Sequence, residues 1–146
     1  MEPKPKETNV KQAVPFFMVT NIEASVKFYA EGLGFRMRNK WIDEGKLQWC
    51  WLEIGDAGLM LQEIRTTPKD GHEPRPLTGK LGEGVSICFM CTDALLIYRE
   101  VTARGVKAQR PFVGNGLWVT NVIDPDGYLL AFESPTDEPE ESVYDE

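Results

Sequence analysis

The chain has 146 residues, 42% of them hydrophobic and 27% charged, and its formal net charge is −7. A chain of this length supports one domain of ordinary size, and no run in it approaches the roughly 18 apolar residues that a membrane-spanning helix needs. Six acidic residues and no Lys or Arg lie in residues 136–146, so the rest of the chain is close to neutral. Because phosphate binding needs a clustered basic patch, this distribution argues against nucleic acid as a partner.

Residues 1–12 read as a flexible N-terminus with no apolar stretch of the kind found in signal peptides, so we expect a cytoplasmic protein. The three cysteines, Cys50, Cys88 and Cys91, all lie in apolar runs, which is typical of reduced thiols packed as small hydrophobic side chains. Cys88 and Cys91 have a C-x-x-C spacing, but residues i and i+3 of a strand point to opposite faces, so they should not share a metal.

The first half of the chain predicts a strand, a helix and three further strands. Residues 13–19 have the length and hydrophobicity of a buried strand. Thr20 or Asn21 is suited to cap a helix that begins near Ile22, and Gly32 or Gly34 is suited to end it. A strand is expected at 35–41, followed by a hairpin of 47–54 with 59–64 around the glycine-containing turn 55–58.

The second half predicts the same order of elements after a connection at 66–83 that is rich in Pro and Gly and contains the only histidine, His72. A strand is expected at 84–91, a helix from 93 or 94 to 104, a short strand near 106–112, and a hairpin of 117–123 with 128–133. The acidic residues 136–146 are expected to form a disordered tail.

The two halves repeat one another. Val14 to Val85 and Gly34 to Gly105 are steps of 71 residues, and later in each half the step is 69, which pairs Trp49 with Trp118. The sequence therefore predicts an α+β fold, a single domain over 13–135 in which two β-α-β-β-β units, 13–65 and 84–135, form a curved mixed sheet with helices on its outer face.

Several motifs resemble the vicinal oxygen chelate superfamily, which includes glyoxalase I, extradiol dioxygenases and the fosfomycin- and bleomycin-resistance proteins. They are the run from Val19 to Tyr29 with Gly32-Leu-Gly-Phe35, the second strand opening at Gly84, and Ile123-Asp-Pro-Asp-Gly-Tyr128 ahead of Phe132-Glu-Ser-Pro135. The resemblance implies that metal-using members take one ligand from the first and one from the last strand of each unit. Those positions match Val14, Gln62, Val85 and Ala131, three of which cannot donate to a metal, so neither a metal nor another cofactor is expected.

Strand alternation predicts what lies on the concave, helix-free face instead. The face is expected to be apolar and aromatic with few polar groups, as in pockets for organic ligands, and tryptophans from both halves would offer stacking surfaces. A cationic ligand would meet Glu53 or Glu133. The expected ligand-binding residues are Phe16, Met18, Trp49, Trp51, Glu53, Met60, Gln62, Phe89, Trp118 and Glu133.

The loss of metal ligands together with an aromatic groove is most similar to the bleomycin-resistance branch. That resemblance implies an antibiotic-resistance type of protein, a homodimer that sequesters a small hydrophobic or aromatic molecule unaltered, and no catalytic residue is assigned. One alternative is a metal-dependent enzyme of glyoxalase, isomerase or dioxygenase type that uses displaced ligands such as His72, Gln62 and Glu133. Another is an interaction module whose tryptophan face is buried by a second chain.

Overall fold

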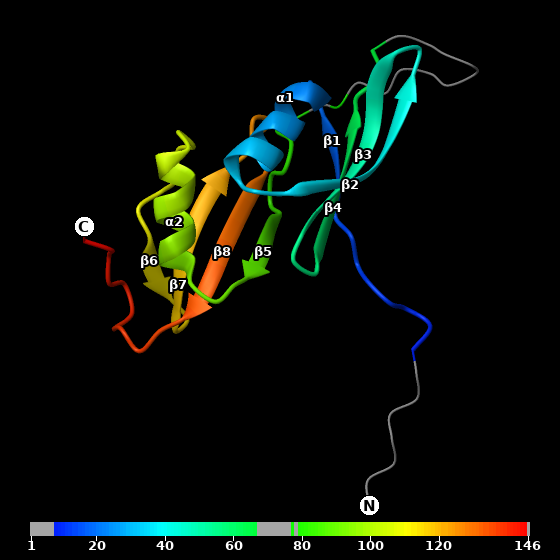
Figure 1. Cartoon of the computed structure of the whole chain (residues 1–146). Coiled ribbons are helices and arrows are strands. Elements are labelled where there is room, and N and C mark those ends of the chain that lie inside the picture. The colour runs from blue at the N-terminus through cyan, green and yellow to red at the C-terminus, as the bar shows by residue number, and fades with distance from the viewer. Residues whose placement is uncertain (1–7, 67–76, 78, 146) are drawn as a thin grey trace, which may run out of the picture.

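The computed structural model describes residues 8–66, 77 and 79–145, and it confirms the α+β fold (Figure 1). His72 and most of the connection at 66–83 lie outside the described residues. The elements of the first unit are β1 (Phe16–Val19), α1 (Ile22–Lys27), the π-helical turn η1 (Phe28–Gly32), β2 (Arg36–Asp43), β3 (Lys46–Ile54) and β4 (Ala57–Glu63). Those of the second unit are β5 (Ser86–Met90), α2 (Ala94–Ala103), β6 (Phe112–Gly114), β7 (Leu117–Ile123) and β8 (Leu129–Pro135).

The strands form two four-stranded sheets instead of one continuous sheet. Their orders are β1-β4-β3-β2 and β5-β8-β7-β6, so the two units have the same topology. In each sheet the first strand runs parallel to the last strand of its unit, and the remaining pairs are antiparallel. Figure 1 shows α2 lying across β7 and β8, which leaves the opposite face of that sheet without a helix.

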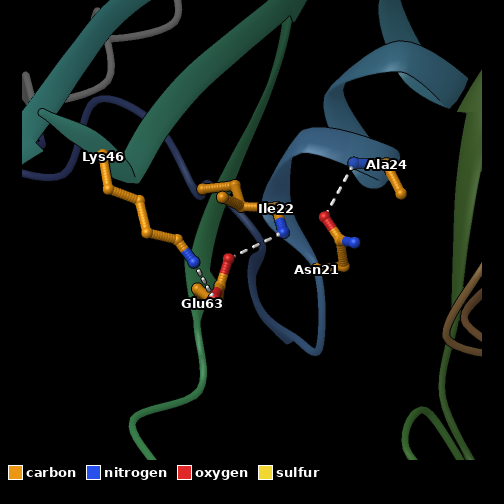
Figure 2. Close-up of polar contacts among 5 residues, drawn as sticks. All are labelled: Asn21, Ile22, Ala24, Lys46 and Glu63. Carbon is orange, nitrogen blue, oxygen red and sulfur yellow. Dashed lines mark hydrogen bonds and ion pairs between the residues drawn. The ribbon is translucent and has the colours of Figure 1, made fainter.

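The predicted start of the first helix is confirmed. The side chain of Asn21 accepts a hydrogen bond of 3.1 Å from the backbone N–H of Ala24, which satisfies one of the free donors at the helix N-terminus. Figure 2 shows a second acceptor there, the carboxylate of Glu63 at the end of β4, which takes the N–H of Ile22 at 3.1 Å and also pairs with Lys46. Glu63 therefore ties the last strand of the first unit to its helix.

The N-terminus of α2 in the second unit is also capped by side chains, but by different residues. Asp93 caps α2 by accepting from the N–H of Leu96 at 3.0 Å. The hydroxyl of Ser134 on β8, which is buried, accepts from the N–H of Ala94 at 2.8 Å. Ser134 thus takes the place that Glu63 has in the first unit, and its role is structural.

The helix-covered faces of both sheets pack into one core. Leu59 and Leu61 of β4 and Leu130 of β8 are fully buried members of a single cluster of hydrophobic residues. The two units also contact each other through the β7–β8 turn, where the ring of Tyr128 stacks on Phe17 with centroids 3.9 Å apart. The two units therefore share one hydrophobic core.

A buried polar pair lies between the units. The hydroxyl of Tyr29 donates to the carboxylate of Asp124 at 2.7 Å, and the N–H groups of Asp126 and Tyr128 donate to the other oxygen of the same carboxylate. Burial raises the pKa of Asp124, and burial together with the nearby carboxylate raises the pKa of Tyr29. These titratable groups belong to the seam between the units, so their shifted pKa values reflect packing.

Three sequence predictions about the second half are wrong. The strand expected at 106–112 is reduced to β6 and one isolated bridge at Ala108. The thiol of Cys88 is exposed, since it lies on the helix-free face, whereas Cys50 is buried as expected. Residues 136–145 do not form a disordered tail: the N–H of Tyr144 donates to the carbonyl of Pro111 at 2.8 Å, so the segment lies along β6.

Within the described part of the chain, the helices are too short and too polar to cross a membrane.

Candidate ligand-binding site

The helix-free face of the first sheet gathers most of the residues that the sequence predicts for a ligand. On β4, Leu59 and Leu61 are buried toward the helix, so Met60 and Gln62 point the other way. Strand pairing extends the same face outward, because Met60 lies between Phe16 on β1 and Trp51 on β3, and Gln62 lies between Met18 and Trp49. We call this surface, formed by Phe16, Met18, Trp41, Trp49, Trp51, Glu53, Met60 and Gln62, the aromatic face.

Trp41 was missed by the sequence analysis. It lies on β2 directly opposite Trp49 in the antiparallel register and is 44% exposed. The tight turn at Glu44 and Gly45, both of which have positive φ, pairs Ile42 with Leu47, and a register shift beyond Ile42 brings Trp41 opposite Trp49. Counting from the turn alone would pair Trp41 with Gln48, so no clear signal in the sequence indicated a third tryptophan on the face.

Trp51 is held in place by its neighbours. A Cβ added at Gly58 would come within 3.0 Å of the Trp51 indole nitrogen, so the absence of a side chain at Gly58 makes room for the indole. The guanidinium carbon of Arg38 lies 4.9 Å from the centroid of the Trp51 ring, which is cation–π geometry. One surface of this tryptophan is therefore already covered by a cation of the same chain.

Glu53, one of the two carboxylates expected to meet a cationic ligand, is also occupied. Glu53 forms an ion pair with Arg36, its direct partner across β2 and β3. Arg36 and Arg38 were not among the predicted site residues, because no face was assigned to the strand expected at 35–41, although both alternate with the core-facing Met37. The charged rim of the aromatic face thus consists of two arginines and one carboxylate.

A hollow of about 750 Å³ adjoins the β1 side of the aromatic face. Its walls include Phe16 and Met18 from β1, Tyr128 from the second unit, and residues 80–83 from the end of the connection. The lining is predominantly apolar, and the volume is within the range of pockets that bind small organic molecules. The hollow and the aromatic face share Phe16 and Met18, so a bound molecule could contact both.

Two predicted ligand-binding residues lie on the wrong side of the second sheet. Phe89 is 8% exposed, pairs with Phe132 and packs with it toward the helix, with ring centroids 5.1 Å apart. The prediction carried the 71-residue step from β1 into β5, but the strand register pairs Phe16 with Met60 and Ser86 with Leu129. The step from Phe16 to Ser86 is 70 residues, and the step from Met60 to Leu129 is 69. The predicted step of 71 is therefore one residue too long on β5, and an error of one residue moves a side chain to the opposite face of the sheet.

Trp118 is the second such residue. It alternates with Thr120 and Val122, whose side chains are buried under α2, and its ring lies edge-on to Tyr144 of the C-terminal segment at 6.2 Å. The β3–β4 turn has two residues between the paired Ile54 and Ala57, whereas the β7–β8 turn has five between Ile123 and Leu129. The two turns differ in length by three residues, and because three is an odd number, Trp49 and Trp118 lie on opposite faces of their sheets.

Glu133 points to the helix-free face of the second sheet, as predicted, since it alternates with the buried Phe132 and Ser134. The same face carries Ser86 and Cys88, so Ser86 and not Val85 shares a side with Ala131. Among the described residues, no group of three or more His, Cys, Asp or Glu side chains is arranged to hold a metal ion. The proposed use of His72 as a ligand lies outside the described residues.

Comparison with known proteins identifies the class. The family model of the glyoxalase/bleomycin resistance protein/dioxygenase superfamily matches residues 11–132, and the chain belongs to this superfamily. The match covers both units, which agrees with the duplicated β-α-β-β-β topology. No curated protein matches the chain.

Solved structures share this fold at low sequence identity. TioX from Micromonospora sp. ML1 is 20% identical with a TM-score of 0.65, over 87% of this chain and 100% of that one. TnmS3, an antibiotic binding protein from Streptomyces sp. CB03234, is 18% identical with a TM-score of 0.66, over 89% and 100%. A glyoxalase-related enzyme from Clostridium phytofermentans is 16% identical with a TM-score of 0.64, over 90% and 100%. Binding proteins and enzymes therefore share the fold, and the site must distinguish them.

Proposed function

We propose that this protein binds a small aromatic or hydrophobic molecule on the aromatic face and sequesters it without chemical change. The observation that carries the proposal is the gathering of Trp41, Trp49 and Trp51 on one helix-free sheet face, next to an apolar hollow of about 750 Å³. Indole rings provide large stacking surfaces at low conformational cost, which suits a flat ligand. The polar groups at the rim would then orient the ligand.

The residue types on this face support binding more than catalysis. The first-unit positions that supply metal ligands in related enzymes correspond here to Val14 and Gln62, and only the amide of Gln62 has a donor atom in its side chain. TnmS3, with the same fold, is described as an antibiotic binding protein, so the scaffold is compatible with this role. We therefore place the protein with the binding members of its superfamily.

We further propose that a second copy of the chain completes the groove. The first strand of each unit, β1 and β5, is an edge of its sheet, and exposed edges with apolar neighbours favour association. Large hydrophobic side chains are exposed at or near these edges, including Phe16 at 45%, Val85 at 59% and Met90 at 64%. A two-fold pair would bring the helix-free face of one unit against that of the other unit in the partner.

Titration of tryptophan fluorescence tests the binding proposal. We expect fused-ring probes such as 2-naphthol and acridine to quench the emission saturably and to raise the melting temperature of the protein. Trp49→Leu should abolish the saturable quenching, whereas the control Trp118→Leu should retain it, because Trp118 lies on the covered face. Recovery of the probe unchanged after incubation would support sequestration; conversion of the probe, or no binding across a varied panel, would overturn the proposal.

Light scattering coupled to size-exclusion chromatography tests the second copy. A mass twice that of the 16.5 kDa chain would support the completed groove, and a monomer at high micromolar concentration would contradict it.

A further inference from the structure

We propose that the ligand of the aromatic face carries an anionic group, with a carboxylate as the simplest case, and that Arg38 binds it. This inference rests on the proposed function and narrows the class of ligand. It reverses the expectation of a cationic ligand, which assigned Glu53 or Glu133 and the tryptophan rings to a positive charge.

The position of Arg38 comes from the irregular strand β2. Met37 pairs with Leu52 and Asn39 with Trp51, so Arg38 is an extra residue opposite no partner. Arg38 alternates with Met37, whose side chain packs toward the core, so Arg38 points to the same face as Arg36. Its guanidinium lies over Trp51, at 4.9 Å from the ring centroid, and therefore on the aromatic face.

Among the described residues, the guanidinium of Arg38 has no carboxylate partner. Glu53 is paired with Arg36, and within the described residues no ion pair or hydrogen bond joins Arg38 to a carboxylate. Stacking on an indole restricts the guanidinium plane without using its N–H donors. A planar cation with unused donors, held at the rim of an apolar surface, matches the fork geometry of a carboxylate.

The same contacts disfavour a cation. A positively charged ligand would have to displace Arg38 from Trp51 or Arg36 from Glu53 before it could reach either group. It would also approach a rim of net positive charge, since Arg36 and Arg38 are balanced only by the single carboxylate of Glu53. Trp41 and Trp49 remain available to stack on the aromatic body of an anionic ligand.

Three probes of one shape test the charge preference: 2-naphthoate, the neutral 2-naphthamide and the cationic 2-naphthylmethylammonium. We expect wild-type protein to bind the naphthoate at least about tenfold more tightly than the amide, and the ammonium most weakly. Raising the salt concentration should reduce the preference for the acid, because part of it is electrostatic.

Variants then assign the preference to one residue. Arg38→Met keeps an unbranched side chain on Trp51 and should reduce the preference for the acid over the amide to about twofold or less. Lys40→Met removes a positive charge from the same strand and is a matched control, since Lys40 pairs with Cys50 away from the aromatic face; it should retain the preference.

Equal binding of acid and amide by the wild type, or tighter binding of the ammonium, would overturn the inference while the proposed function stands. The wild-type comparison needs no variant, so it decides the matter even if Arg38→Met fails to fold. Binding of none of the three probes would overturn both proposals.

Discussion

The helix-free faces of the two units differ, although the units share one topology. In the first unit Trp49 lies opposite Gln62, and Trp51 lies opposite Met60. In the second unit the position that matches Gln62 is Ala131, which lies between Asn121 and Cys88. The covered faces, in contrast, both carry fully buried leucines, and both helices are capped from the last strand of the unit. The residues packed under the helices are therefore similar in the two units, whereas the residues on the helix-free faces differ. The tryptophans of the helix-free faces lie in the first unit.

The largest effect is expected on the covered face. Leu61→Ala should lower the free energy of unfolding by about 2–5 kcal/mol, because Leu61 is fully buried and its truncation leaves a cavity. Its neighbour Met60, half-buried on the aromatic face, is the matched control, and Met60→Ala should cost about 1 kcal/mol or less. Urea unfolding measures both values, and equal losses would contradict the assignment of the two faces.

The next largest effect is expected from a substitution that makes the helix-free face of the first unit more like that of the second. Trp49→Asn gives the first unit the asparagine that the second unit has opposite Ala131. Affinity for a fused-ring ligand should fall at least tenfold, or about 1.4 kcal/mol, because a stacking surface is lost. Calorimetric titration gives the affinity, and thermal unfolding confirms that the variant folds. Unchanged affinity in a folded variant would move the site away from Trp49.

Removal of a cap should have a smaller effect. Ser134→Ala removes the acceptor for the N–H of Ala94 and should lower the free energy of unfolding by about 1 kcal/mol. Ser134→Thr retains the hydroxyl and is the control. If the two variants were equally stable, the hydrogen bond from β8 would not be what secures α2.

The alkylation rates of Cys50 and Cys88 distinguish the covered face from the helix-free face in the unmutated protein. Burial raises the pKa of Cys50 to about 11, so little thiolate forms near neutral pH, whereas Cys88 is exposed on the second open face. With an alkylating reagent at pH 8, Cys88 should react at least about tenfold faster than Cys50, as followed by peptide mass spectrometry. Denaturant should make the two rates similar. A faster reaction at Cys50 would place it on an accessible surface.

Much of the fold followed from the sequence because it depends on local signals. The strand-helix order, the capped start of the first helix near Ile22 and the paired hairpins arise from residue patterns that act over short distances. The tail was mispredicted because its acidic composition is typical of disorder, yet Tyr144 packs against Trp118 and Tyr98. These two aromatic contacts and the backbone hydrogen bonds to Pro111 and Val113 hold the segment in place despite its acidic composition.

The site was predictable only where the register was simple. The alternation on β1, β3 and β4 placed the first-unit residues on one face, and strand pairing confirms that placement. Phe89 and Trp118 were placed by counting residues between the repeats, which fails when a turn differs by an odd number of residues. Trp41 could not be placed by counting from its turn, because a register shift separates it from Ile42, and Arg38 was missed because no face was assigned to its strand.

We propose that the ligand binds to the aromatic face and not to the aromatic side chains of Tyr98, Trp118 and Tyr144 near the C-terminal segment. Selective ¹⁵N labelling of tryptophan gives an indole N–H resonance for each of Trp41, Trp49, Trp51 and Trp118, assignable from single Trp→Phe variants. On addition of 2-naphthoate, the resonances of Trp49 and Trp51 should shift progressively to saturation while that of Trp118 stays in place. A shift of Trp118 with Trp49 and Trp51 unmoved would contradict the account.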